Sequence, residues 1–124
     1  MEEKIISIDQ GTSSTRSVLY SKKGELLDSS QEEFEQYFPN EGWVEHNPEQ
    51  IWKTVESTLT SLVHRNDISS NEIASIGITN QRETTVLWNK ATGRPISNAI
   101  VWQDRRTSEF CDHLSSDLDL IHKK

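Results

Sequence analysis

The sequence predicts an α/β domain whose mixed sheet opens with an antiparallel three-stranded meander. Three observations carry this prediction. Short apolar runs separated by turn residues fill the N-terminal third of the chain, a strong helix start follows near residue 47, and a further alternating apolar run spans 73–79. This order of β segments, one helix and another β segment is typical of the α/β or mixed class, with a central strand near the N-terminus.

The first three β segments lie close together along the chain. Residues 5–8 form a short, mostly apolar run that predicts a buried strand, and the polar loop 9–16 follows it. A second strand is expected to begin at 17–20. The segment 22–25 contains a glycine that tolerates positive φ and predicts a turn, and a third strand is expected over 26–34. Tight turns between consecutive strands indicate antiparallel pairing.

A helix is predicted from Asn47 to about His64. Asn47 suits the N-cap, Pro48 suits the first helical position, and Gln50 occupies the third. The apolar residues recur at helical spacing, which predicts that one face of this helix packs against the sheet. The residues of that face are Ile51, Trp52, Val55, Leu59, Leu62 and Val63.

The C-terminal third predicts shorter elements after the strand at 73–79. Residues 85–88 and 96–102 are strand-like, and 90–93 reads as the turn between them. Asp104 is expected to cap a last helix over about 105–114.

Composition limits the classes of protein. The chain has 124 residues, enough for one domain, but only 32% of them are apolar, where soluble domains reach about 45–50% by a closely similar count. The net charge of -7 disfavours a nucleic-acid partner, which would select a basic surface. Neither a signal peptide nor a membrane-spanning stretch is evident, and a single cysteine, Cys111, excludes an internal disulfide. We therefore expect a cytoplasmic protein without a membrane partner.

The loop at 9–16 is the first candidate functional segment. Gly11 gives the backbone room, and hydroxyl groups stand beside main-chain N–H groups, an arrangement that can hold phosphate oxygens. Asp9 is placed to hold Mg²⁺ directly or through water, and Arg16 to neutralise phosphate charge. The alternative is an ordinary hairpin turn rich in Ser and Thr. The hydroxyl groups come from Thr12, Ser13 and Ser14.

Two further segments carry polar groups past the end of an apolar run. Arg82 and Glu83 follow the strand at 73–79, where an Arg donor and a Glu acceptor suit a polyhydroxylated substrate. Trp102 closes another apolar run, and its ring suits packing on the carbons of a small polyol. The alternatives are a solvated ion pair and a core tryptophan.

The histidines show no metal-ligand spacing, so each is expected at the surface. They are His46, His64, His113 and His122.

Taken together, four stretches resemble the N-terminal part of the glycerol kinases, a branch of the sugar-kinase family with the actin/hexokinase-like ATPase fold, which is RNase H-like. The stretches are 7–16, 41–46, 76–84 and 98–107, and the resemblance extends over residues 4–122. The first stretch is shared by many sugar kinases. The second and third are much more specific to the glycerol branch.

The resemblance implies phosphoryl transfer from MgATP to a terminal hydroxyl of glycerol, which gives sn-glycerol 3-phosphate. Asp9 would place Mg²⁺, through water, and the phosphates. Arg16 would contact the phosphates of ADP or ATP, as would the three hydroxyl residues of the loop. Arg82 and Glu83 would hydrogen-bond the glycerol hydroxyls, and Trp102 would pack on the glycerol carbons. The protein would act chiefly by positioning and charge neutralisation.

Glycerol kinases are several times longer than this chain, and no aspartate here matches their catalytic base. We therefore expect residues 1–124 to be the first part of the N-terminal domain of a longer, homo-oligomeric kinase, inactive alone, with an apolar face that the rest of the sheet would cover. Two alternatives stay open. One is another polyol or pentulose kinase, and the other is a non-catalytic, acidic α/β binding module.

Overall fold

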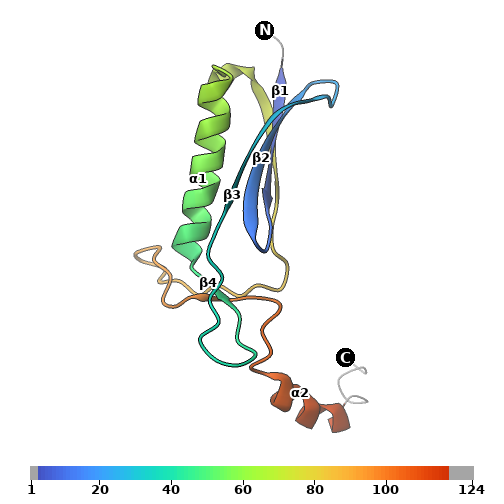
Figure 1. The fold of residues 1–124 in the computed structure, drawn as a ribbon, viewed down its shortest axis with the longest axis vertical. Helices are drawn as coiled ribbons and strands as arrows, with labels where there is room; N and C mark the ends of the chain where they lie inside the picture. The colour runs from blue at the N-terminus through green and yellow to red at the C-terminus, as the bar shows by residue number, and fades with distance from the viewer. Residues whose placement is uncertain (1–2, 118–124) are drawn as a thin grey trace.

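A four-stranded mixed sheet with one long helix on its face forms the body of the molecule (Figure 1). The structure is a computed structural model that describes residues 3–117. In space the strands follow the order β3 (Leu26–Glu33), β2 (Ser14–Ser21), β1 (Lys4–Gln10) and β5 (Ile73–Thr79), and the helix is α1 (Pro48–Arg65). The predicted mixed sheet with its opening meander is confirmed.

Strand pairing decides where the functional segments meet. β1 pairs antiparallel with β2, and β2 pairs antiparallel with β3. β1 pairs parallel with β5, in a register that places Asp9 beside Thr79. Because β1 and β5 are parallel neighbours, their carboxyl ends open at the same edge of the sheet, where ligands of α/β proteins bind.

Helix α1 begins as predicted. The Asn47 side chain accepts a hydrogen bond of 2.9 Å from the Glu49 N–H, and Pro48 occupies the first turn. The predicted buried face is wrong at Trp52, whose surface is 60% exposed. Two threonines, Thr54 and Thr58, are buried on the helix instead.

The interface between α1 and the sheet is partly polar. The Thr15 hydroxyl lies 2.7 Å from that of Thr54, and the Ser17 hydroxyl lies 2.9 Å from that of Thr58. Because each buried hydroxyl has a partner, this interface closes without apolar side chains at those positions. The pairing accounts for part of the low apolar content. The apolar cluster beside it consists of Ile6, Ile8, Leu19, Leu62 and Ile68.

The segment after β5 forms less regular structure than predicted. Of the expected strand 96–102, only β6 (Ala99–Ile100) is present, and it pairs antiparallel with β4 (Glu45–His46). The expected strand 85–88 contributes two isolated bridges, one to β6 and one from Trp88 to Pro95. The turn at 90–93 is present, and Gly93 takes a φ of 70° there. A 3₁₀ turn (Ser70–Glu72) leads into β5.

The last helix, α2 (Ser108–Leu114), starts later than predicted and is followed by a 3₁₀ turn (Ser115–Asp117). The prediction that Asp104 caps it is wrong, because Thr107 is its N-cap residue. Asp104 instead accepts a hydrogen bond of 2.7 Å from the Val44 N–H. Figure 1 shows α2 away from the sheet, at the end of the molecule opposite the N-terminus.

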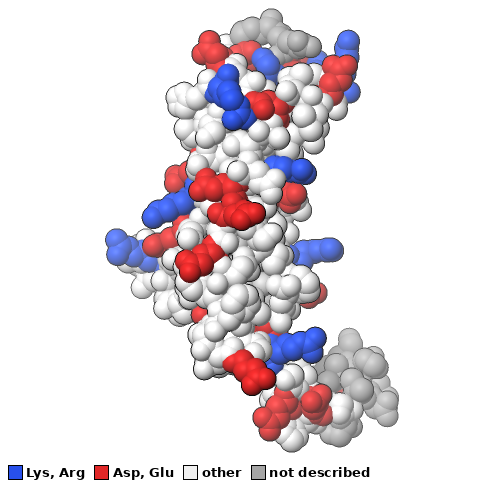
Figure 2. Space-filling view, viewed as in Figure 1, with Lys and Arg blue, Asp and Glu red and all other residues white. Residues whose placement is uncertain are grey.

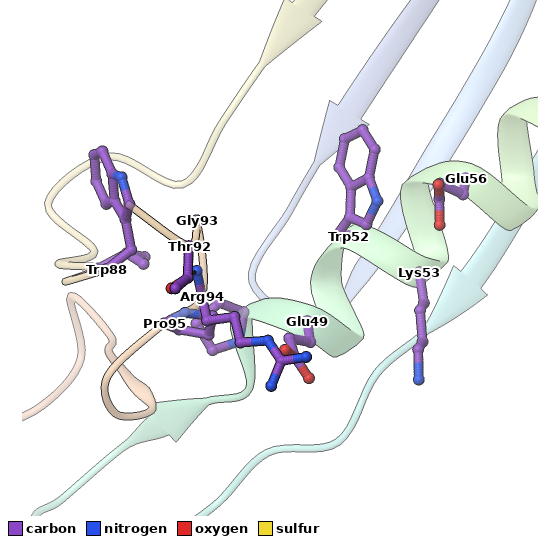
Figure 3. Close-up of a pocket in the computed structure, with 11 residues that line it drawn as sticks. Glu49, Trp52, Lys53, Glu56, Trp88, Thr92, Gly93, Arg94 and Pro95 are labelled. Atoms are coloured by element: carbon purple, nitrogen blue, oxygen red, sulfur yellow. Dashed lines mark hydrogen bonds between the residues drawn. The ribbon is translucent and has the colours of Figure 1, made fainter. Parts of the chain in front are cut away.

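Several apolar side chains are exposed. On β5, Ile76 and Ile78 are 50% and 74% exposed, although they pair with the buried Ile6 and Ile8. A groove of about 650 Å³ separates the first turns of α1 from the hairpin at 86–95. Figure 3 shows Trp52 on the helix and Trp88 on the hairpin at this groove.

None of the described helices is long and apolar enough to cross a membrane.

Candidate functional site

A cavity of about 480 Å³ lies where the carboxyl ends of β1 and β5 meet. Five of the predicted site residues line it, although they come from three separate parts of the sequence. They are Asp9, Thr12, Arg82, Glu83 and Trp102. The larger groove beside α1 contains none of the predicted residues. The remaining lining residues are Gln10, Gly11, Asn80 and Gln81.

The loop between β1 and β2 offers backbone donors. The Gly11 N–H donates to the Ser14 carbonyl at 2.9 Å, which closes a tight turn, and a Cβ at Gly11 would lie 3.2 Å from that carbonyl. Within residues 3–117, neither the Thr12 N–H nor the Ser13 N–H donates a hydrogen bond. Successive N–H groups of this kind form anion-binding concavities, so the loop has the donors that a phosphate needs.

Three predicted phosphate ligands stand outside the cavity lining. Ser13 is exposed beside the cavity, and the Ser14 hydroxyl accepts a hydrogen bond of 2.9 Å from Gln31. Arg16 is exposed on β2, directly opposite Asp9 in the strand pairing. The pair Asp9 and Arg16 therefore shares the sheet face that points away from α1, because Ile8 and Ser17 occupy the α1 face.

Glu83 holds an uncommon backbone conformation. Its φ of 62° lies in the left-handed region, which costs a residue other than glycine about 1 kcal/mol or more. Such conformations persist where the surrounding structure imposes them, and they cluster at ligand sites. The turn aims the Glu83 and Arg82 side chains from the end of β5 toward the cavity. Nothing in the residue pattern predicts this conformation.

Trp102 connects the segment after β6 to the β1–β2 loop, called the phosphate loop below. Its indole Nε1 donates a hydrogen bond of 3.0 Å to the Thr12 hydroxyl, and its backbone N–H donates to the Thr84 hydroxyl at 3.4 Å. The residue is 52% exposed and lines the cavity. Trp102 is therefore not a core residue, and its side chain borders the cavity while the indole N–H is held by Thr12.

A cluster of charged residues that the sequence pattern did not predict stabilises the loop that follows Trp102. Arg106 forms ion pairs of 2.8 Å with Asp104 and with Glu45, and its guanidinium lies 3.7 Å from the centre of the Trp43 ring. The hydrogen bonds from Arg106 lower the pKa of Asp104 to about 2, and those to Asp104 and Glu45 raise the pKa of Arg106. The cluster ties the β4 region to the loop after β6.

His46 is buried, contrary to the surface position expected for it. No part of its surface is exposed, and the Phe34 ring meets it edge-on with the two ring centres 5.0 Å apart. Burial lowers the pKa of His46. His64 is exposed as expected, and His122 lies outside the described residues.

Residues 3–117 show neither a preformed metal-binding cluster nor, on the face in Figure 2, a basic stripe. Residues 3–117 contain no cluster of three or more His, Cys, Asp or Glu side chains that could hold a metal. Figure 2 shows charges of both signs mixed over one face, without a continuous basic stripe. Asp9 is the metal-binding candidate that the sequence indicates, and the Glu83 carboxylate lines the same cavity. That suits Mg²⁺, which keeps several water ligands and takes one or two carboxylates together with substrate phosphates.

Comparison with known proteins identifies the class. Residues 4–123 match the model of the N-terminal domain of the FGGY family of carbohydrate kinases. A glycerol kinase from Bacillus cytotoxicus is 54% identical over 114 residues, which are 92% of this chain and 23% of that protein. The chain belongs to the FGGY carbohydrate kinase family. It spans about a quarter of the length of the relatives that it matches.

Solved structures agree with this assignment. The glycerol kinase of Plasmodium falciparum, crystallised with ADP, superposes with a TM-score of 0.83 at 34% identity, over 93% of this chain and 23% of that one. A gluconate kinase from Lactobacillus acidophilus superposes with a TM-score of 0.85 at 22% identity, over 94% of this chain and 23% of that one. The second likeness shows a shared fold. The expected sugar-kinase fold is confirmed.

Proposed function

We propose that these residues are the first part of the N-terminal, substrate- and phosphate-binding domain of a glycerol kinase. The enzyme transfers the terminal phosphoryl group of MgATP to glycerol and forms sn-glycerol 3-phosphate. The observation that carries the proposal is the single cavity in which the Asp9–Thr12 loop faces Arg82, Glu83 and Trp102. The 54% identity to a glycerol kinase supports glycerol as the substrate over the sugars that other family members phosphorylate. The catalytic base and the adenosine-binding domain come from sequence beyond this segment.

The phosphate side of the cavity would work through the β1–β2 loop. The N–H groups of Thr12 and Ser13 donate to phosphate oxygens, helped by the hydroxyls of Thr12, Ser13 and Ser14. Arg16 contacts the phosphates of ADP or ATP from the sheet face that it shares with Asp9. Asp9 holds Mg²⁺ through a water molecule. When bound, the ion neutralises the charge that the phosphates carry during transfer.

The other side of the cavity would hold glycerol. Arg82 donates hydrogen bonds to hydroxyl oxygens, and Glu83 accepts them from hydroxyl hydrogens. Trp102 packs its ring on the glycerol carbons while its indole N–H stays on Thr12. Fixing both substrates in one cavity supplies the positioning on which phosphoryl transfer depends.

A pentulose kinase is the second candidate within the family. Solved xylulose kinases share the fold, but at 21–23% identity they support nothing beyond the fold. A non-catalytic binding module would leave the cavity without a ligand. We further propose a cytoplasmic, homo-oligomeric enzyme without a nucleic-acid or membrane partner. The acidic net charge of -7 supports the absence of a nucleic-acid partner.

A substrate panel on the whole enzyme tests this proposal. Initial rates of ADP formation with glycerol, D-xylulose and D-gluconate should give glycerol the highest kcat/KM. Arg82→Ala should lower that value about 10- to 100-fold, because one charge-assisted hydrogen bond is lost. Arg94→Ala, at the groove beside α1, is the matched control and should keep the wild-type value. An equal or higher kcat/KM with D-xylulose would overturn the substrate assignment.

Calorimetry distinguishes the kinase hypothesis from that of a non-catalytic binding module. The whole enzyme should bind MgADP and glycerol, and Asp9→Asn or Arg82→Ala should weaken the binding of the corresponding ligand. Absence of both binding and turnover would favour the non-catalytic module.

A further inference from the structure

A chain of hydrogen bonds through the buried His46 connects the two sides of the cavity. From this chain we infer that His46 is a positioning residue, which holds the phosphate loop and the loop of Arg82 and Glu83 in one mutual arrangement. The inference rests on the proposed function for its kinetic consequences. The geometry itself comes from the fold.

The imidazole touches one glutamine from each side. His46 Nε2 lies 2.5 Å from Gln36 Oε1, and His46 Nδ1 lies 3.3 Å from Gln81 Nε2. Gln36 follows strand β3 and contacts the β1–β2 loop at Thr12. Gln81 immediately precedes Arg82 and lines the cavity.

The partners of the two glutamines fix the direction of every bond. Gln36 donates its Nε2 to the Thr12 carbonyl at 3.0 Å, so its Oε1 is left to accept from His46 Nε2. Gln81 accepts at Oε1 from the Thr84 hydroxyl at 3.1 Å, so its amide nitrogen faces His46 Nδ1. His46 is therefore the neutral tautomer with the proton on Nε2. A proton on Nδ1 would oppose the Gln81 amide hydrogens.

Both ends of this hydrogen-bond network reach the phosphate loop. At one end Gln36 holds the Thr12 carbonyl. At the other end Gln81 donates to Gln10 Oε1 at 3.2 Å, and Gln10 donates to the Gly11 carbonyl at 2.9 Å. In a trans peptide the N–H points opposite to the preceding carbonyl. Holding these two carbonyls thus fixes the direction of the next two N–H groups, those of Thr12 and Ser13.

Two substitutions at His46 each break a different hydrogen bond of this network. In His46→Asn the side-chain amide reaches the position that the histidine Nδ1 occupies, but not that of Nε2. It can therefore still accept a hydrogen bond from Gln81, but it no longer contacts Gln36. In His46→Gln the amide reaches as far as Nε2, so it can still donate to Gln36 but no longer accepts from Gln81. Each variant therefore breaks one of the two His46 bonds and keeps the other. The bond from Gln81 to Gln10 does not involve His46, so the Gly11 carbonyl stays held in both variants.

The test measures both KM values of the whole enzyme. His46→Asn should raise the KM for ATP about fivefold with less than a twofold change for glycerol, and His46→Gln should show the reverse. The size is that of one neutral hydrogen bond. His64→Asn, at an exposed position on α1, is the matched control and should change neither KM. A merely structural role predicts equal changes in both KM values for both variants, which would overturn the inference.

A second readout does not depend on turnover. Nitrogen NMR of the labelled enzyme should show His46 with a protonated Nε2 and an unprotonated Nδ1. The backbone amide signals of Thr12 and Ser13 should move in His46→Asn more than in His46→Gln. A proton on Nδ1, or unmoved loop signals, would overturn the inference even in an active enzyme. Inactivity of the wild-type enzyme with every substrate would count against the proposed function, and the NMR result would still decide the role of His46.

Discussion

Replacing Thr54 with valine should destabilise the fold through a single hydroxyl. Thr54 is 2% exposed, and its hydroxyl donates to the Ile51 carbonyl at 2.7 Å. The Thr15 hydroxyl, 2.7 Å away, must therefore donate to Thr54. Valine has the same shape but cannot accept, so Thr15 is left as a buried donor without a partner. Leaving such a group unsatisfied costs about 1–3 kcal/mol.

The assay is urea unfolding of the purified chain, followed by tryptophan fluorescence. Thr54→Val should lower the free energy of unfolding by about 1–3 kcal/mol. The double variant Thr15→Val with Thr54→Val should recover much of that loss, because two apolar groups of matching shape then meet. Thr60→Val, at an exposed position on the same helix, should change stability by less than about 0.5 kcal/mol. A double variant whose loss equals the sum of the single losses would refute the pairing.

Three further predictions concern the site. Glu83→Gly should raise the unfolding free energy by about 1 kcal/mol, since glycine accepts the positive φ, yet weaken glycerol binding measured by calorimetry. Asp104, whose side chain is 3% exposed and whose pKa is about 2 in the fold, contributes about 2 kcal/mol at neutral pH. This stability is complete above about pH 4 and is lost as the pH falls through about 2, so unfolding of Asp104→Asn should depend less on pH in that range. Residues 1–124 alone should form no glycerol 3-phosphate above the level of Arg82→Ala, in a coupled assay.

The sheet and the long helix follow from local signals. Alternating apolar residues and turn residues predict the meander, and the Asn47–Pro48 pair predicts where α1 begins, because both signals act within a few residues. The face that α1 buries was predicted less well. Thr54 and Thr58 look polar in the sequence, yet each finds a hydroxyl on β2, and only the helix–sheet pairing supplies that partner.

The site shows the same division between local and distant signals. Asp9, Thr12 and Arg82 stand at strand ends, which the sequence indicates, and the parallel pairing of β1 with β5 brings them together. His46 was expected at the surface because histidine spacing showed no metal site. Its burial depends on Gln36 and Gln81, which lie 10 and 35 residues away along the chain.

Asp104 shows how a local signal can mislead. An aspartate ahead of a helical segment is typical of an N-cap, and Asp104 was predicted to have that role. In the fold its carboxylate is taken by Arg106 and the Val44 N–H, and the helix begins after Thr107. Both carboxylate oxygens already accept hydrogen bonds from Arg106 and Val44, so Asp104 is held away from the helix start by partners that only the fold supplies.

A crystal structure of the whole enzyme with glycerol and ADP would test the central claim most directly. The account predicts glycerol in the cavity at the carboxyl ends of β1 and β5, with its hydroxyls on Arg82 and Glu83 and its carbons against Trp102. The ADP phosphates should approach the N–H groups of Thr12 and Ser13. Glycerol bound in another cavity, with Arg82 and Glu83 in contact with water alone, would contradict the account.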